Sequence, residues 1–434
     1  MNGPPKRVTR EIWAWAMYDF ANSGYSTVVL TAVYNAYFVG VVAGNLGTGK
    51  ATLLWTLALG LSNGLVILSA PLIGAIADAQ GTKKRFLAVS TLVCAMSTAL
   101  LGLTASVPLA VTLLVLSNLA FATGENLVAA FLPEVAPEGK IGRVSAFGWS
   151  LGYLGGLTVL GLSLALVGTH APQLASHGVP QAMGLAALMY GIAALPTFIW
   201  VPERRALSTA PPRGYLKTGF GRLKRTADEI ETFPDLRWFL AAGFAMASGT
   251  FTVTVLAAVY AHEVFGFATS ELLGLFMVLN VVAAGGAFAF GQLQDRWGSV
   301  PALNLSLGLW IASLSLAFLA QNRPTFWAAA IGVGVAMSGS QSMGRALLGM
   351  LTPAERFAEF YGFWGMTLRL AAVVGPVSFG AIVAGTGGNL RLGLLSTATY
   401  FLLGLLLLTR VDEQRGRQRA HHEPGAHVSN ESKS

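Results

Sequence analysis

Four charged residues lie inside long apolar stretches of this chain, where a charge is costly. Asp19 and Glu125 supply carboxylates, and Arg345 and Arg369 supply guanidinium groups. A charged side chain at the centre of a bilayer costs on the order of 3 kcal/mol, so an ionisable residue at that depth is a candidate for function. A carboxylate in an apolar setting can exchange a proton near neutral pH, and an arginine can hold a carboxylate through two parallel hydrogen bonds. These residues therefore indicate handling of protons or of a charged solute at membrane depth.

Each of these charges also has a structural interpretation. Asp19 and Glu125 can cap a helix end or pair with a neighbouring helix. Arg345 can extend its guanidinium towards the membrane surface, whereas Arg369 lies too deep in its segment to do so easily. Arg369 therefore needs an acidic or carbonyl partner, which is either a ligand or another part of the chain. Both interpretations stay open at the level of the sequence.

The elements that must position these residues are long apolar segments. Of 434 residues, 54% are hydrophobic and 11% are charged, against about 25% charged in a soluble domain. A helix needs about 20 apolar residues to cross a bilayer. The composition predicts an all-α membrane protein with twelve transmembrane helices in two six-helix halves. The predicted segments lie at about 12–40, 53–77, 86–105, 108–131, 144–168, 181–200, 238–260, 271–291, 300–320, 325–348, 359–384 and 390–409.

A short charged motif occurs twice between these segments. The first copy is residues 74–81 (GAIADAQG) and the second is residues 291–298 (GQLQDRWG), and both read Gly-x-x-x-Asp-x-x-Gly. The copies lie 217 positions apart, which is half of the 434 residues. Such an internal repeat indicates two homologous membrane halves. The glycines fit a tight connection between helices, because glycine accepts a positive φ without strain.

Charge placement predicts the domain boundaries and the orientation. We expect an N-terminal half at 1–200, a cytoplasmic linker at 201–235, a C-terminal half at 236–410 and a disordered cytoplasmic tail at 411–434. With both termini in the cytoplasm, the outer loops hold only Lys50, Arg323 and Arg391, which agrees with the positive-inside rule. The linker is either a basic amphipathic helix on anionic lipid or a solvated connector.

Several segments resemble one branch of the major facilitator superfamily, which includes the fungal vacuolar amino-acid effluxers linked to autophagy and many bacterial relatives. The duplicated motif is similar to the superfamily signature between helices 2 and 3 and between helices 8 and 9. The resemblance implies secondary transport by a protein of the bacterial plasma membrane. The segments similar to the branch are 15–25 (WAMYDFANSGY), 131–137 (FLPEVAP), 142–153 (GRVSAFGWSLGY), 343–345 (MGR) and 358–362 (AEFYG).

The resemblance assigns roles to the polar residues. Helices 1, 4, 7 and 10 line the central cavity in the superfamily, and the polar faces of this chain lie on those helices. Asp19 or Glu125 would couple transport to an ion, with a proton as one candidate. The residues predicted to contact a solute are Asn22, Tyr25, Asn126, Gln341, Arg345 and Arg369, with a further Ser/Thr face at Ser248, Thr250, Thr252 and Thr254. The residues predicted to gate the cavity are Gly74, Asp78, Gly81, Lys84, Arg85, Gly291, Asp295 and Gly298.

The same resemblance predicts where the motif aspartates lie when the cytoplasmic side is closed. Asp78 would approach the start of helix 11, around residues 358–361. Asp295 would approach the start of helix 5, around residues 142–144. A carboxylate is stabilised at a helix N-terminus by about 0.3–1 kcal/mol.

Other classes of function find little support in the residues. No serine nucleophile motif, metal-ligand spacing or cofactor motif occurs in the sequence. We therefore expect no bound cofactor and no enzyme activity, which includes that of a membrane-embedded enzyme. Residues 44–50 nearly match a phosphate-binding loop, but Ala51 stands where Ser or Thr should hold magnesium. The net charge of +8 is spread over loops and predicts no nucleic-acid partner. We expect a monomer in membrane lipid that takes a small polar solute, such as an amino acid; the alternative is a transport-inactive sensor or scaffold on the same fold.

Overall fold

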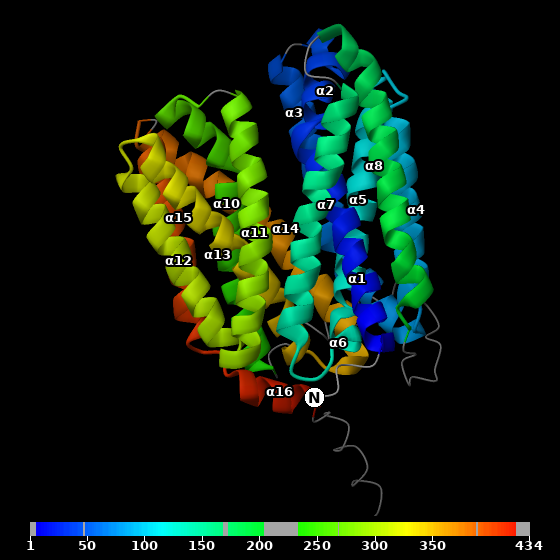
Figure 1. The fold of residues 1–434 in the computed structure, drawn as a ribbon, viewed down its shortest axis with the longest axis vertical. Coiled ribbons are helices and arrows are strands. Elements are labelled where there is room, and N and C mark those ends of the chain that lie inside the picture. The colour runs from blue at the N-terminus through cyan, green and yellow to red at the C-terminus, as the bar shows by residue number, and fades with distance from the viewer. Residues whose placement is uncertain are drawn as a thin grey trace, which may run out of the picture.

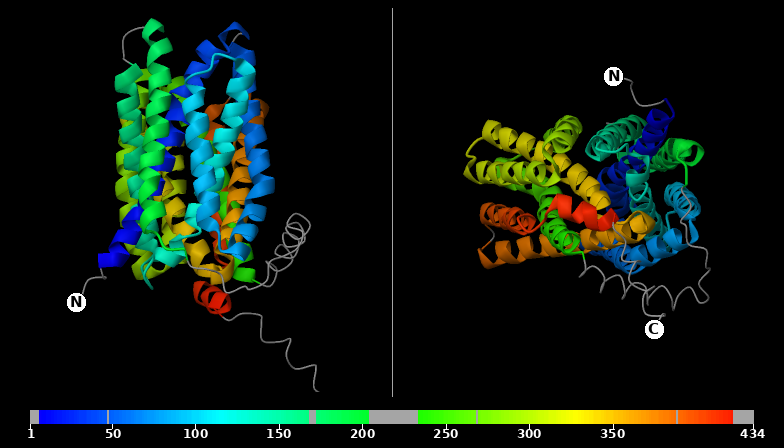
Figure 2. Two further views of the ribbon diagram at one scale, coloured as in Figure 1. Left: turned by 90° about the vertical axis from the view of Figure 1, so that its right-hand side faces the viewer. Right: turned by 90° about the horizontal axis from the view of Figure 1, so that it is seen from below.

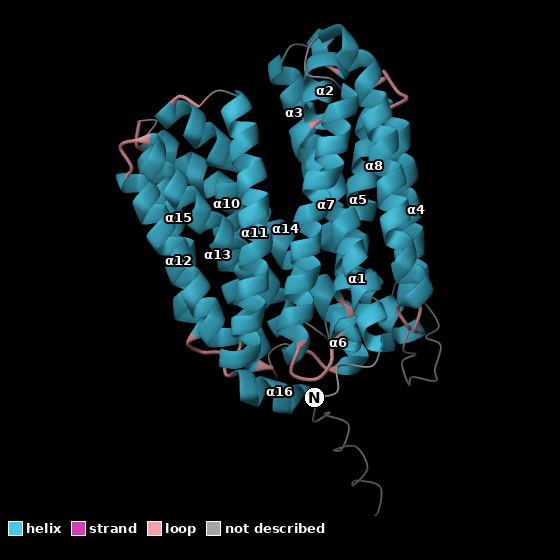
Figure 3. Cartoon of the chain, viewed as in Figure 1, coloured by secondary structure: helices cyan, strands magenta, loops and turns pink. Residues whose placement is uncertain are grey.

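The computed structural model describes residues 6–46, 48–167, 172–203, 233–267, 269–387 and 389–421. The elements assigned within these residues are all helices (Figure 3). Most of the linker predicted at 201–235 lies outside the described residues, as does the end of the tail beyond residue 421.

The first half forms one bundle of long helices. Its opening helix continues through π-helical turns, which makes a single apolar stretch from Thr9 to Val42. The elements are α1 (Lys6–Tyr25), η1 (Ser26–Ala32), α2 (Tyr34–Tyr37), η2 (Phe38–Val42), η3 (Gly44–Leu46), α3 (Thr48–Gln80), α4 (Lys83–Leu101), α5 (Val107–Ala129), α6 (Leu132–Val135), α7 (Ile141–Val167) and α8 (Pro172–Trp200).

The second half forms the other bundle, and the two stand side by side in Figure 1. Its elements are α10 (Pro234–Phe265), α11 (Thr269–Trp297), α12 (Ser299–Leu319), α13 (Arg323–Leu351), η4 (Ala354–Arg356), α14 (Phe357–Gly385), α15 (Leu390–Leu408) and α16 (Glu413–His421). We call the end of the molecule that carries α16 and the start of α1 the terminal end; Figure 2 shows it from the side and from below.

Eleven of the described helical stretches are long and apolar enough to cross a membrane. The twelfth long helix, α13, spans 29 residues but is less apolar, because serines, a glutamine and Arg345 crowd its last half. Those polar residues are largely buried by neighbouring helices rather than exposed to lipid. The chain is therefore a multi-pass integral membrane protein with the predicted all-α fold.

Aromatic stacking fills the core of each bundle. In the first bundle, Tyr25 stacks on Phe121 with ring centroids 4.8 Å apart. In the second, Trp310 stacks on Phe401 at 4.4 Å. Between the bundles, α3 packs on α14 and α7 packs on α11. Further contacts between the halves join α13 to α7 and α14 to α5.

Part of the tail is ordered, which corrects the expectation of disorder from residue 411. Glu413–His421 form α16, which packs against α10 and α13. The Asp412 N–H donates to Asp235 Oδ1 at 2.8 Å, and Glu413 Oε2 accepts from the Ser299 N–H at 2.6 Å. The polar composition of the tail predicted disorder. In the structure, its polar groups bond to the starts of α10 and α12, which are distant in the chain.

Candidate functional site

An ion pair joins the two halves between α1 and α13. Arg345 Nη1 lies 2.8 Å from Asp19 Oδ2 and 3.0 Å from Oδ1. The other guanidinium nitrogens bond to Ser145 of α7, with Nε 3.2 Å from Oγ and Nη2 2.9 Å from the carbonyl oxygen. The side chains are 9% and 12% exposed for Arg345 and Asp19. A pair so enclosed cannot exchange its partners for water without movement of the halves.

Aromatic residues fix the guanidinium of Arg345 in place. The rings of Trp15 and Trp149 lie 4.8 and 5.4 Å from its central carbon. The Tyr361 hydroxyl donates to the Arg345 carbonyl oxygen at 2.8 Å. Gly148 leaves the room that this cluster needs, because a Cβ there would collide with Asp19, Trp15 and Arg345. The chain therefore builds a single geometry for this pair rather than a loose contact.

A second ion pair crosses between α5 and α14. Arg369 Nη2 lies 2.9 Å from Glu125 Oε2, and the Glu125 side chain is 43% exposed. The predicted alternative for Arg369, a carboxylate of its own protein, is thus present in this conformation. Glu125 is therefore the more exposed carboxylate of the two pairs, since the Asp19 side chain is 12% exposed.

Two asparagines near these pairs carry amide donors that lack partners among the described residues. Asn22 Oδ1 accepts from the Tyr190 hydroxyl at 3.1 Å, but its Nδ2 donates to no described group. Asn126 Nδ2 is likewise unpartnered, and the amide lies against Gly365 of α14. A buried donor without an acceptor costs about 1–3 kcal/mol. An acceptor on a ligand is one way to satisfy them.

The remaining predicted solute contacts are already engaged. Gln341 Oε1 accepts from the Tyr153 hydroxyl at 2.9 Å, which links α13 to α7. The Tyr25 hydroxyl lies 2.8 Å from Ser117 Oγ inside the first bundle, and Tyr25 is only 1% exposed. Tyr25 therefore serves the core of its own half in this conformation. The hydroxyls of the predicted Ser/Thr face in α10 bond to carbonyls one turn back in the same helix: Ser248, Thr250, Thr252 and Thr254. The first three of these residues are buried, and Thr254 is exposed.

The motif aspartates occupy the positions predicted for them. Asp78 Oδ2 accepts from the Glu359 N–H at 2.8 Å, at the start of α14. Asp295 Oδ1 accepts from the Gly142 N–H at 3.1 Å, at the start of α7. Each carboxylate thus crosses to the other half and meets the positive end of a helix. These contacts hold the halves together at the terminal end.

The duplicated motif is helical for most of its length, which corrects the expectation of a connection between helices. Gly74 and Gly291 lie within α3 and α11, where they serve close packing: a Cβ at Gly74 would collide with the Ala358 carbonyl of α14. Gly81 and Gly298 do supply the turns, with φ of 59° and 90°. The first glycine of each copy therefore allows close packing of helices, and the last glycine of each copy allows the turn.

A model of the family described as "Vacuole effluxer Atg22 like" matches residues 47–421. The chain belongs to this Atg22-like family. It is 27% identical to the uncharacterised MFS-type transporter YxiO of Bacillus subtilis, over 94% of this chain and 96% of YxiO. It is 26% identical to autophagy-related protein 22-1 of Aspergillus niger over 67% of this chain, which spans about half (50%) of that fungal protein.

Solved structures place this Atg22-like protein in the major facilitator fold. Human MFSD10, an organic anion transporter, aligns with a TM-score of 0.71 and 18% identity over 94% of this chain and all (100%) of MFSD10. The transporter FucP in its outward conformation aligns with a TM-score of 0.73 and 13% identity over 93% of this chain and 98% of FucP. The predicted superfamily and branch are confirmed, so the chain belongs to a family of transporters rather than of enzymes.

The three basic residues that follow the first copy of the motif make different contacts in this Atg22-like structure. Lys84 bonds within its own half, donating from Nζ to the Phe198 carbonyl oxygen at 3.0 Å, and Arg85 is exposed. Lys83 instead lies 3.3 Å from Asp78 Oδ1 and also pairs with Glu134. Sequence reasoning missed Lys83 because three basic residues follow each other and only the helix phase decides which one turns inward.

Other residues of the Atg22-like site were also missed. Arg143 Nε lies 3.0 Å from Asp295 Oδ2. Ser145 and Trp149 belong to the segment 142–153 that carries the family resemblance, so that segment held the available signal. Within the described residues, no group of three or more His, Cys, Asp or Glu side chains gathers as a metal site would require.

Replacing Asp78 with asparagine is expected to open the terminal end more often. The variant loses the charge that meets the start of α14, a contact of about 0.3–1 kcal/mol or more when buried, and the ion pair with Lys83. Ala146→Cys offers a reporter, because Ala146 is buried between α7 and α11 and the native Cys94 is buried too. We expect faster labelling of this cysteine by a membrane-impermeant thiol reagent.

Glu203→Gln is the matched control for this gating prediction. Glu203 also accepts a backbone bond at the terminal end, from the Lys84 N–H at 2.9 Å, but within one half. Its neutralisation should leave the labelling rate unchanged. Equal labelling of the Asp78→Asn and parent proteins would contradict a gating role for the motif.

Proposed function

We propose that this Atg22-like protein is a secondary active transporter of a small zwitterionic solute, with an amino acid as the first candidate, that works by alternating access and couples to protons. The observation that carries the proposal is the pair of ion pairs Asp19–Arg345 and Glu125–Arg369. In both, the carboxylate comes from the first half and the guanidinium from the second. A site built in this way is acidic on one wall and basic on the other.

A zwitterion can replace the contact between Glu125 and Arg369. Its ammonium group would face the Glu125 carboxylate and its carboxylate would face the Arg369 guanidinium, so neither protein charge is left unpaired. The planar guanidinium can bind that carboxylate through two parallel hydrogen bonds. The unpartnered Nδ2 donor of Asn126, next to Glu125 in α5, supplies a further hydrogen bond to an acceptor on the solute. We assign solute binding to this pair because Glu125 is the accessible carboxylate.

The pair between Asp19 and Arg345 suits the coupling step. It crosses between the halves near the contacts of the motif aspartates, so it must separate when the terminal end opens. Protonation of Asp19 removes the charge that holds Arg345 and thus weakens the contact. Transport of a proton with or against the solute would follow from that linkage.

The basic residues of the terminal end support a cytoplasmic location for that end, in a bacterial plasma membrane. Lys83, Arg143 and Arg296 lie there, whereas Lys50, Arg323 and Arg391 lie at the opposite end. Arg and Lys are enriched on the cytoplasmic side of membrane proteins. The cross-half contacts at Asp78 and Asp295 then describe a transporter closed to the cytoplasm.

Purified protein in liposomes would test the solute class. Liposomes loaded with a pool of amino acids and related metabolites are assayed for counterflow of labelled compounds. For an amino acid that is taken up, Arg369→Lys should raise KM roughly tenfold, because lysine keeps the charge but loses the forked geometry. An amine of the same skeleton without the carboxylate should keep its KM.

Arg323→Lys is the control for this experiment, since Arg323 also pairs with a carboxylate, Glu271, at 2.8 Å, but is exposed and lies at the opposite end. It should behave as the parent protein does. Equal losses for the amino acid and the amine in Arg369→Lys would overturn the solute assignment. A folded parent protein that moves no compound of the pool would favour a sensor or scaffold.

A further inference from the structure

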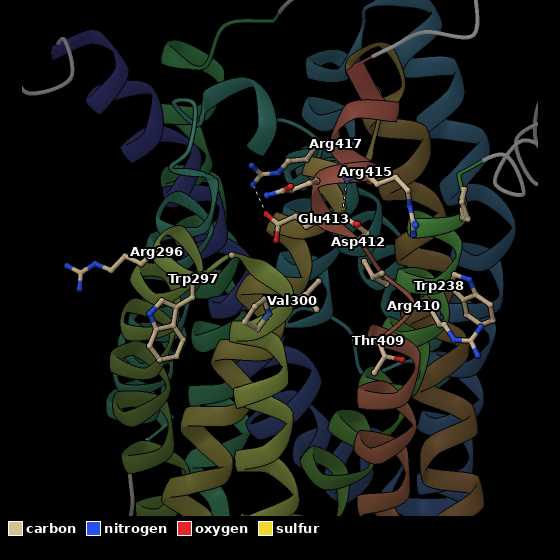
Figure 4. A pocket seen from close by; sticks show the side chains of 15 residues that line it. Trp238, Arg296, Trp297, Val300, Thr409, Arg410, Asp412, Glu413, Arg415 and Arg417 are labelled. Atoms are coloured by element: carbon tan, nitrogen blue, oxygen red, sulfur yellow. Dashed lines mark hydrogen bonds and ion pairs between the residues drawn. The ribbon is translucent and has the colours of Figure 1, made fainter.

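A cavity of about 930 Å³ lies at the terminal end of the second half, away from both ion pairs that cross the halves. It is bounded by the starts of α10 and α12, the ends of α11 and α15, and by α16 (Figure 4). The volume exceeds what a bare phosphate needs and suits a larger polar headgroup. Its arginines and tryptophans are Trp238, Arg296, Trp297, Arg410, Arg415 and Arg417.

Two of the arginines that line the cavity, Arg415 and Arg417, already pair with carboxylates of the protein. Arg415 binds both carboxylate oxygens of Asp235, with Nε 2.9 Å from Oδ2, and the hydrogen bonds to Asp235 raise the pKa of Arg415 above its ordinary value. Arg417 Nη2 lies 2.7 Å from Glu413 Oε1. The pair between Arg415 and Asp235 and the bond from the Ser299 N–H to Glu413 fix α16 on the bundle, so the cavity is formed without a ligand.

The rim at α10 and α15 carries two arginines on one indole ring. The guanidinium carbons of Arg237 and Arg410 lie 5.5 and 5.6 Å from the ring centroid of Trp238. Both arginines are exposed, and neither has an ion-pair partner in the part of the chain that the structure describes. Figure 4 shows Arg410 beside Trp238 on this rim, opposite Arg296 and Trp297. Arg410 and Trp238 line the cavity, whereas Arg237 lies outside its lining, next to Trp238 in α10. The two arginines concentrate positive charge at this edge of the cavity, and that charge favours an anion there.

We propose that this rim and cavity bind a phosphate-bearing anion. Arg237 and Arg410 hold the phosphate beside Trp238, and the rest of the anion occupies the cavity that α16 helps to line. Arginine matches phosphate with two parallel hydrogen bonds, and tryptophan is typical of the membrane–water interface. The phosphate can come from an anionic phospholipid of the surrounding leaflet or from a soluble phosphate compound; both present the same group to the arginines.

The test uses the full-length protein in detergent with two probes. Native mass spectrometry measures retention of phosphatidylglycerol against phosphatidylcholine from an equimolar mixture. Thermal unfolding in millimolar inorganic phosphate measures binding of the soluble group. The double variant Arg237→Gln/Arg410→Gln should lower binding of the active probe roughly fivefold for each arginine removed. Arg410→Lys alone should give an intermediate loss of binding. This single variant replaces the double variant in the test if the double variant is not monodisperse.

Arg10→Gln is the matched control. Arg10 also stacks on a tryptophan at the terminal end, 4.0 Å from the Trp200 centroid, but in the first half and away from the cavity. A loss of phosphatidylglycerol retention in the rim variants alone supports the site, with a phospholipid as the source of the phosphate. A phosphate effect that fails only in those variants supports it with a soluble source. Equal behaviour of parent and rim variants with both probes, or an equal loss in Arg10→Gln, overturns the proposal.

Discussion

Asp19→Asn is expected to abolish accumulation of solute against its gradient while exchange of solute continues. Asparagine keeps the shape of the side chain and can still accept a hydrogen bond from Arg345, but it cannot take up or release a proton. If the Asp19–Arg345 pair couples proton movement to solute movement, the two halves of the Asp19→Asn variant can still rearrange around bound solute. They can no longer draw on a proton gradient while doing so. The measurement is uptake into liposomes with an imposed pH difference, beside counterflow without one.

Two further variants make this coupling test specific. Glu125→Gln should instead weaken solute binding in both assays, because Glu125 is the accessible carboxylate of the second pair. Glu271→Gln, in an exposed pair at the opposite end, should change neither assay, since exposed ion pairs contribute about 0–1 kcal/mol. Normal accumulation in both Asp19→Asn and Glu125→Gln would show that neither carboxylate couples transport to protons.

Arg345→Gln is expected to cause the largest loss of stability of any single change at the site. The substitution leaves the Asp19 carboxylate buried without its partner and empties the space between Trp15 and Trp149. Removing one partner of a buried ion pair costs about 3–5 kcal/mol. The change should appear as a lower midpoint of thermal unfolding in detergent.

A double variant separates the ion pair from simple packing. Asp19→Asn/Arg345→Gln removes both charges, so it should recover much of the stability lost in Arg345→Gln. Arg323→Gln removes an arginine from an exposed pair and should cost little. A double variant that is no more stable than Arg345→Gln would show that packing of the guanidinium, rather than pairing with Asp19, dominates at this position.

The two ion pairs explain why the charges of the two halves belong together. Asp19 and Arg345 are 326 positions apart in the chain, and Glu125 and Arg369 are 244 apart. Each half contributes one sign to both pairs, so either half alone would expose unpaired charges at membrane depth. Movement of one half against the other must therefore exchange partners at these positions, whether the new partner is a solute, a proton or another side chain.

Residue types and spacing sufficed for the parts of this protein that depend on local patterns. Apolar stretches of membrane length predicted the helices, since a bilayer admits few other structures. The repeated motif predicted two halves and, with the superfamily resemblance, placed Asp78 at the start of α14 and Asp295 at the start of α7. The depth of four charges in those stretches identified the residues of the two ion pairs.

Only the tertiary structure decided how those residues are partnered. It pairs Arg345 with Asp19 and Arg369 with Glu125, turns Lys83 rather than Lys84 towards Asp78, and directs the Tyr25 hydroxyl into its own bundle. It also orders α16 through bonds to Asp235 and Ser299. Helical periodicity places a residue on a face but not opposite a neighbour. The neighbour is set by packing between helices that are distant in the chain, and a buried charge takes whichever partner that packing brings within reach.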